Sequence, residues 1–171
     1  MFEAIAARLP RVLQLEGPVH GEIASDSNAT IQAIVVTAVA ALVASLTGEG
    51  GFATRIIGAV ILAPIGLFIW TGIAFLLGKM FGGQADYISL ARPMGYAAAP
   101  YALAIVPVIG QLAGAIYSAF IQVKLHQEVN GLSQGSAIGV VVIPLVVLFA
   151  IGFILTLLGL ALLAGLGDIG S

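Results

Sequence analysis

Long apolar runs separated by short polar breaks make up the chain from residue 29 onward. Runs without a charged residue cover 29–48, 56–78, 93–123 and 137–166, and glycine, asparagine and charged residues gather in the breaks between them. A helix needs only about 20 apolar residues to cross the hydrocarbon core of a bilayer, which is about 30 Å thick. The pattern therefore predicts a protein built from membrane-spanning helices.

The uncharged stretch between Arg92 and Lys124 is too long for one span. Its 31 residues would form a helix about 46 Å long, which fits a bilayer only at a tilt of about 50°, beyond the usual range of roughly 0–40°. Pro107 and Gly110 lie near its middle and favour a tight hairpin. We therefore expect two spans here.

The last apolar run, Ala137 to Leu166, is nearly as long. It has no Pro-plus-Gly turn near its middle, and Pro144 comes early in it. We expect one tilted span, with a sixth span as the alternative. The sequence thus predicts an all-α, polytopic membrane protein with a transmembrane domain over 30–167. Its five helices are expected at about 30–47, 55–78, 89–106, 109–128 and 136–166.

Residues 1–29 are the most polar part of the chain. Their apolar side chains recur at helical spacing, at Phe2, Ile5, Leu9, Val12 and Leu13. This spacing predicts a short amphipathic arm at the membrane surface, which Pro10 would bend or restart. In the alternative, these apolar side chains pack on the chain's own bundle.

Composition supports the membrane assignment. Only 8% of the 171 residues are charged and 60% are hydrophobic, whereas soluble domains carry about 25% charged residues. This excludes a soluble enzyme and a disordered chain, and the lack of cysteine excludes a disulfide scaffold. Six scattered basic residues do not form a nucleic-acid footprint. We expect membrane lipids and other membrane-protein subunits, or a second copy, as partners.

The basic residues also predict an orientation. With five spans, one side of the membrane receives all of them except Arg55, namely Arg8, Arg11, Lys79, Arg92 and Lys124. Basic residues accumulate on the cytoplasmic side. We therefore expect a cell (inner) membrane protein whose N-terminus is cytoplasmic and whose C-terminus lies outside.

Three segments carry recognisable motifs: a glycine pair, a "GY…P…P-x-x-G" block, and LHQEVNGLS over residues 125–133 ahead of the last span. The positions in the first two are Gly82, Gly83, Gly95, Tyr96, Pro100, Pro107 and Gly110. In the order and spacing of these segments the chain resembles the Yip1-domain family of membrane proteins. The resemblance covers roughly residues 5–160.

The resemblance implies a five-helix bundle with a cytoplasmic N-terminus, and a scaffold rather than an enzyme. Eukaryotic relatives contact prenylated Rab GTPases and carry an Asp-Leu-Tyr-Gly-Pro motif that this sequence lacks, so the chain resembles the prokaryotic members. We expect a non-enzymatic scaffold or adaptor, or a small helical subunit of a larger membrane complex. The alternative is an oligomeric transporter or channel component.

The fourth predicted span carries a polar stripe. Its members are spaced by seven, four and four positions on one helical face: Gln111, Ser118, Gln122 and His126. Such a stripe usually holds helices together, and the alternative is a hydrophilic conduit. Gly110 and Gly114 beside it have the small-xxx-small spacing of close helix packing, within the chain or between two copies.

Charged residues at the predicted cytoplasmic ends of the helices form a candidate interaction face for a partner or anionic lipid. They are Lys79, Asp86, Arg92, Lys124 and Glu128. In the alternative, they only anchor the helix ends.

No catalytic, cofactor or metal site is expected. Residues 131–135 match G-x-S-x-G around Ser133, but that motif needs a strand-to-helix turn, and the context here is helix-turn-helix. We interpret Gly131 as the end of the fourth helix and Ser133 or Ser136 as the cap of the fifth. The two histidines, His20 and His126, are 106 positions apart, which gives no metal-ligand spacing.

Overall fold

The computed structural model describes residues 1–47 and 51–169, and every regular element in these ranges is helical. The elements are α1 (Phe2–Leu13), α2 (Gly17–Ser25), α3 (Ala29–Ser45), α4 (Phe52–Ile57), the π-helical turn η1 (Gly58–Leu62), α5 (Ala63–Met80), α6 (Tyr87–Ala97), the 3-10 helix η2 (Ala99–Ile105), α7 (Ile109–Asn130) and α8 (Gln134–Ile169). The predicted all-α class is confirmed for this part of the chain.

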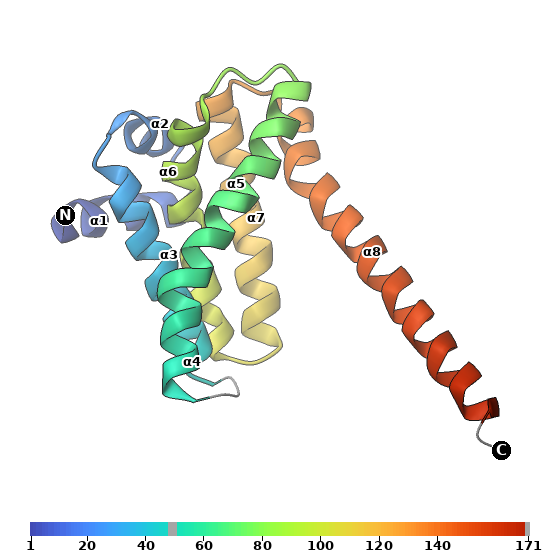
Figure 1. Cartoon of the computed structure of the whole chain (residues 1–171). Helices are drawn as coiled ribbons and strands as arrows, with labels where there is room; N and C mark the ends of the chain where they lie inside the picture. The colour runs from blue at the N-terminus through green and yellow to red at the C-terminus, as the bar shows by residue number, and fades with distance from the viewer. Residues whose placement is uncertain (48–50, 170–171) are drawn as a thin grey trace.

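The helices form a bundle from which one helix departs (Figure 1). α3, α5, α6 with η2, and α7 run beside one another, and α1 and α2 lie against the bundle near one end. The connections over residues 81–86 and 131–133 lie at the α2 end, and the turn after η2 lies at the opposite end with α4. α8 starts at the α2 end and runs outward from the bundle.

Within the described residues, two helices are long and apolar enough to cross a membrane. They are Phe52–Met80 and Gln134–Leu160, in which an 18-residue stretch has a mean hydropathy of 2.4 and 3.1, respectively. α2 and α3, which are bent by 118° at their junction, pass as a third candidate only if they are taken together. The chain is thus an all-helical integral membrane protein with two or three spans recognisable by length and composition.

The predicted span 89–106 is not a single α-helix. α6 ends at Ala97, and η2 continues the path as a 3-10 helix with Pro100 in its first turn. Proline cannot donate to the carbonyl four residues earlier, and its ring collides with that carbonyl in an α-helix. The break after Tyr96 and Ala97 therefore follows from Pro100.

The predicted span 55–78 is one helical path from Phe52 to Met80, but it contains a wider turn. The π-helical turn over Gly58–Leu62 directly precedes Pro64. A π-turn lets the helix absorb a proline without breaking, because the backbone is locally rearranged ahead of the ring.

The N-terminal arm consists of two helices rather than one. Pro10 lies inside α1 and does not end it, and the carbonyl of Ala6 that it leaves without a donor is on an exposed residue. The chain turns at Leu15, whose φ is +59°, and α2 begins with Pro18 in its first turn, a favoured place for proline. The second helix of the arm, α2, was not expected from the sequence.

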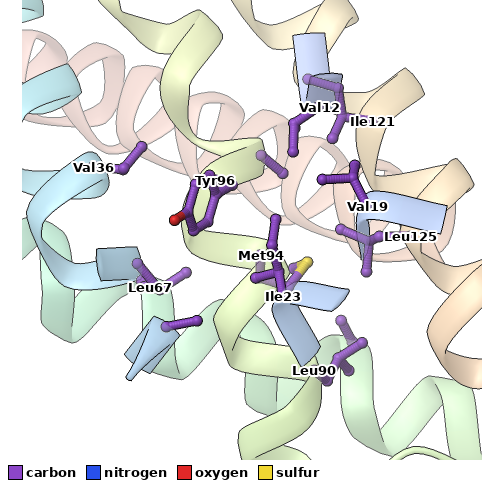
Figure 2. Close-up of a cluster of buried hydrophobic side chains, with 14 of the residues drawn as sticks. Val12, Val19, Ile23, Val36, Leu67, Leu90, Met94, Tyr96, Ile121 and Leu125 are labelled. Carbon is purple, nitrogen blue, oxygen red and sulfur yellow. The ribbon is translucent and has the colours of Figure 1, made fainter. Parts of the chain in front are cut away.

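The hydrophobic core joins the arm to the bundle (Figure 2). Val12 of α1 and Val19 and Ile23 of α2 are fully buried in the same cluster as core residues of α6 and α7. Ile5, Leu9 and Leu13 pack against this cluster. Most of the apolar face of the arm therefore packs on the chain's own bundle, as in the alternative stated for it, whereas Phe2 at its start is 70% exposed.

Candidate functional site

A cavity of about 630 Å³ lies among α3, α5, α6, η2 and α7. Small residues on several of these helices leave the space open, among them Ala41, Ala44 and Gly66. Leu145 of α8 borders the cavity at the point where that helix departs from the bundle. Three of the four residues of the predicted polar stripe, Gln111, Ser118 and Gln122, line this cavity.

The middle of the stripe is held by hydrogen bonds. Ser118 Oγ donates to the carbonyl of Ala97 at 2.7 Å, and Gln122 Nε2 donates to Ser118 Oγ at 3.1 Å. Trp70 Nε1, from α5, donates to Gln122 Oε1 at 2.8 Å. These bonds connect α7 to both α6 and α5. Trp70 was not singled out from the sequence.

His126 lies further along the stripe, in a second polar cluster. It is fully buried, and its Nδ1 is 2.9 Å from Nδ2 of Asn130. Asn130 Oδ1 accepts from the backbone N–H of Ala85 at 3.1 Å, and its own carbonyl accepts from the N–H of Gln84. Asn130 therefore fixes the connection between α5 and α6 against the end of α7. From the sequence, Asn130 was only part of the motif over residues 125–133.

The glycine pair of the predicted family motif lies in that same connection. Gly82 has a φ of +85°, which favours glycine. Gly83 donates to the carbonyl of Gly78 at 2.7 Å, and a Cβ added to Gly83 would lie 3.0 Å from the side chain of Asn130. The two glycines let the chain turn tightly around this asparagine.

Gly95 and Tyr96 bring α6 against α3. A Cβ on Gly95 would collide with Ala33, whose Cα would be 2.5 Å away. The buried hydroxyl of Tyr96 donates to Gln32 Oε1 at 2.5 Å, and Arg8 Nη1 donates to the same oxygen at 3.0 Å. Gln32 thus ties α1, α3 and α6 together. The sequence offered a signal for it, because Gln32 is an amide inside the first apolar run.

The remaining motif residues shape the hairpin between η2 and α7. Pro100 is buried and Pro107 is exposed in the turn. A Cβ on Gly110 would collide with the carbonyl oxygen of Leu103, and one on Gly114 would lie 2.5 Å from the carbonyl oxygen of Pro100. The small-residue pair therefore faces η2 of the same chain.

The charged residues proposed as an interaction face lie mostly at the α2 end of the bundle. Lys79 and Asp86 flank the α5–α6 connection, and Lys124 and Glu128 lie in the last two turns of α7; all four are exposed. Arg92 is half-buried instead. Four of the five predicted residues therefore lie exposed at the α2 end of the bundle, a set called the rim below, and the fifth, Arg92, is partly buried.

Several of these charges have structural contacts. Arg92 donates to the carbonyl of Ala24 at 2.5 Å and to Thr30 Oγ1 at 3.1 Å. Asp86 caps α6 by accepting hydrogen bonds from the hydroxyl of Ser89 and from its backbone N–H, the latter at 3.0 Å. Both bonds lower the pKa of the Asp86 carboxyl. Lys79 Nζ lies 5.3 Å from the ring centroid of Phe75.

Ion pairs within the N-terminal arm connect α1 to residues in and beside α2. Arg11 donates to both carboxylate oxygens of Glu16, at 2.6 and 2.9 Å, and of Glu22, at 2.7 and 2.8 Å. These hydrogen bonds lower the pKa of both carboxyls. Arg8 Nη1 pairs with Asp26 Oδ2 at 2.7 Å and lowers the pKa of that carboxyl in the same way. The ion pairs bend the chain between α1 and α2.

The turn over residues 131–135 has the capping geometry expected from the sequence. Gly131 ends α7 with a φ of +66°, and Ser133 Oγ accepts from the N–H of Ser136 at 3.3 Å. The interpretation of Gly131 as a helix end and Ser133 as a cap is confirmed. Ser133 is exposed and His126 is fully buried.

Comparison with known proteins gives one family. The Yip1 domain matches residues 22–156, which is most of the chain and confirms the resemblance seen in the motifs. No curated protein and no solved structure matched the chain.

Proposed function

The chain belongs to the Yip1 domain family, and on that premise we propose that it is a non-enzymatic membrane scaffold or adaptor that acts as a small helical subunit of a larger assembly. Other membrane-protein subunits are its proposed partners, and the proposed location is the inner cell membrane.

The observation that carries this proposal is the departure of α8 from the bundle. Its first turns pack, with Ala137, Val140 and Val141 buried, but beyond Pro144 its described side chains are exposed. Phe149 is 77% exposed. The helix is apolar on every side here, so a bilayer or the helices of another protein must cover it. A helix that makes few contacts with its own chain is available for contacts with a partner.

Five spans are part of the proposal. α3, with 17 residues, is about 25 Å long and α7, with 22, about 33 Å. α6 and η2, with 11 and 7 residues, add up to about 30 Å, the thickness of the hydrocarbon core. Successive helices alternate between the two ends of the bundle in Figure 1. This alternation supports a cytoplasmic N-terminus and a C-terminus outside, given where the basic residues lie.

The exposed rim of Lys79, Asp86, Lys124 and Glu128 is the proposed docking face of the adaptor. It lies at the same end as α2, where the positive-inside rule places the cytoplasm. Arg92 is not part of the exposed rim; its hydrogen bonds to Ala24 and Thr30 hold α6 against the α2–α3 junction.

Photo-crosslinking in native membranes tests the role of α8. We would place p-benzoylphenylalanine at Phe149 and Leu155 of α8, and at Ile69 and Leu76 of α5 as equally apolar controls that are 61% and 64% exposed. We expect discrete protein adducts from the α8 positions and lipid adducts alone from α5. Lipid adducts alone at all four positions would contradict the proposal.

A transporter or channel component is the second candidate, and the cavity beside the polar stripe favours it. Gln111 lines this cavity and is exposed, so its amide can meet a polar solute. Ser118 and Gln122 are engaged in bonds that join helices, which supports a packing role for that part of the stripe.

Two leucine substitutions separate these candidates. If the stripe packs helices, Gln122→Leu leaves the Trp70 N–H without its acceptor and lowers the unfolding free energy by about 1–3 kcal/mol, while Gln111→Leu changes little. If the stripe conducts, Gln111→Leu leaves stability intact and abolishes the swelling of proteoliposomes in isosmotic glycerol. Absence of swelling in the wild-type protein would exclude a conduit for this solute.

A further inference from the structure

We propose that the cavity bordered by Trp70 and Gln111 binds the hydrocarbon tail of an uncharged, single-chain amphiphile, with a hydroxyl or ester group at its polar end. The proposal rests on α3, α5 and α7 crossing the membrane, as proposed above, and is independent of the scaffold role.

The first argument is the chemistry of the wall. The lining side chains are small aliphatic, large apolar or uncharged polar residues, and none of these described residues carries a charge. An ionised group inside would therefore lack a counter-charge in a low-dielectric environment, which is costly. An apolar cavity of about 630 Å³ with few polar groups lies within the roughly 300–1,000 Å³ range of small-ligand sites.

The second argument is the distribution of the polar groups. Tyr101 of η2 and Gln111 of α7 line the cavity on the side of the Pro107 turn, since they lie six residues before and four residues after Pro107 in the chain. Neither side chain makes a hydrogen bond to a described residue, whereas the polar groups deeper in the cavity, on Trp70, Ser118 and Gln122, are bonded to one another. The free donors and acceptors are thus at one end, where the polar group of an amphiphile would lie.

The third argument is length. On α3 the lining runs from Thr37 to Ser45 and on α7 from Gln111 to Gln122, distances of about 12 and 16 Å along the helix axes. Half of the hydrocarbon core of a bilayer is about 15 Å deep. The cavity therefore extends from one membrane interface to about the bilayer centre, which matches a lipid tail of one leaflet.

Trp70 makes this proposal measurable. It is the single tryptophan of the chain and lines the deep part of the cavity. Bromine on an aliphatic chain quenches tryptophan fluorescence only at short range. We would titrate the full-length protein in nanodiscs with a monoacylglycerol brominated at mid-chain, and compare brominated phospholipid and the brominated fatty acid anion.

Gly66→Leu is the informative variant. Gly66 lines the cavity, and an added Cβ there meets nothing within 4 Å, so a leucine side chain at this position would occupy space that the cavity leaves open. Gly152→Leu is the matched control, because Gly152 is also helical and open, at a position on α8 away from the cavity. Unfolding midpoints of both variants report whether each is folded.

We expect the brominated monoacylglycerol to quench Trp70 at a mole fraction at least 10-fold below that of brominated phospholipid. Gly66→Leu should remove this difference and Gly152→Leu should retain it. Tyr101→Phe with Gln111→Leu should weaken binding roughly 3- to 10-fold by removing the hydrogen bonds to the polar end. This double variant tests the site even if Gly66→Leu fails to fold.

Three outcomes would overturn the proposal. Equal quenching by phospholipid and monoacylglycerol would make the cavity an ordinary part of the lipid-facing surface. Quenching that Gly66→Leu leaves unchanged would place the tail elsewhere. A fatty acid anion that binds as well as the neutral amphiphile would refute the assignment of an uncharged ligand.

Discussion

Two buried polar side chains each join several segments of this bundle. Gln32 joins α1, α3 and α6, and Asn130 joins α7 to the connection between α5 and α6. Both are buried. In a membrane protein, apolar surfaces pack against lipid as readily as against one another, so hydrogen bonds and close packing select the helix pairs.

Replacing Asn130 should destabilise the fold strongly. Asn130→Ala removes the acceptor of the buried Ala85 N–H and the partner of His126 Nδ1, and buried groups left without partners cost about 1–3 kcal/mol each. We expect a loss of about 2–4 kcal/mol in unfolding free energy, measured by denaturant titration in mixed micelles.

Gln127→Ala is the control for Asn130→Ala. Gln127 is half-buried on the same helix and makes no side-chain hydrogen bond to a described residue, so its loss should change the unfolding free energy by no more than about 0.5 kcal/mol. Equal effects of the two substitutions would contradict the role given to Asn130.

His20 should make the arm sensitive to acid. Burial lowers the pKa of His20 from 6.5 to about 4, so below pH 6.5 the unfolded chain binds a proton that the folded chain excludes. Stability is then full above about pH 6.5 and is lost as the pH falls, by about 2 kcal/mol at pH 5. Unfolding of the wild type and His20→Leu between pH 7 and 5 should give a shallower slope in the variant; parallel slopes would refute this.

The sequence identified which polar side chains are buried better than it identified their hydrogen-bond partners. Spacing alone placed Ser118, Gln122 and His126 on one buried face, and all three are buried. Gln111, the first residue of the stripe, is exposed; it lies in the first turn of α7, and its side chain makes no hydrogen bond to a described residue. Trp70 was not found, since nothing in a linear pattern shows that a ring on α5 reaches the amide of Gln122.

Among the elements, the contact between α3 and α6 depends on a missing side chain. Gly95 lets the backbone of α6 approach Ala33, and Thr37 Oγ1 donates to the Gly95 carbonyl at 3.4 Å across the same contact. Small residues allow this kind of approach in membrane bundles. The motif around Gly95 and Tyr96 is therefore explained by packing.

Gly95→Ala should separate α3 from α6. The added methyl group would meet the backbone of Ala33, which cannot move as a flexible side chain can, and we expect a loss of about 2–3 kcal/mol. Thermal unfolding in detergent measures it. Gly135→Ala, at an open helical position of α8, should be neutral or slightly stabilising; a similar loss there would show that the effect is not one of packing.

The regular helices were easier to predict than the irregular ones. α7 begins at the predicted residue and ends two residues beyond the predicted 128, because Gly131 provides a clear stop. α2 was not predicted as a separate helix, since it is short and lies in the polar arm. η2 lies inside the predicted helix 89–106, but its 3-10 form was not predicted. Both helices have a proline in the first turn, where proline is favoured.

For the whole molecule, the proposed five spans predict a pattern of accessibility. The chain contains no cysteine, so single cysteines report their own positions. With a membrane-impermeant maleimide, Gly21→Cys, Gln84→Cys and Ser133→Cys should react from one side of the membrane, and Gly51→Cys and Val108→Cys from the other. Labelling of Ser133→Cys and Val108→Cys from the same side would contradict the hairpin at Pro107.

Composition and hydropathy predicted the class of the molecule and its membrane location, because lipid imposes strong constraints on both. They left packing of the arm on the bundle as an alternative to a place at the membrane surface, and they did not predict that α8 departs from the bundle. An apolar side chain facing lipid and one facing another helix look alike in a sequence. The cavity could not be predicted either, since it arises from small residues on helices far apart in the chain.

α8 is one unbroken helix from Gln134 to Ile169, and among its side chains described as far as Leu160 only those of the first turns pack on the bundle, so it has the geometry of a lever. Leu145, on the wall of the cavity, lies 8 residues beyond the buried Ala137, and Ile169 lies 32 residues beyond it. Rotation about Ala137 that shifts Leu145 by about 1 Å would move Ile169 by about 4 Å, since distance along a straight helix is proportional to residue number. A change in the width of the cavity at Leu145 would therefore produce a displacement about four times larger at the far end of α8.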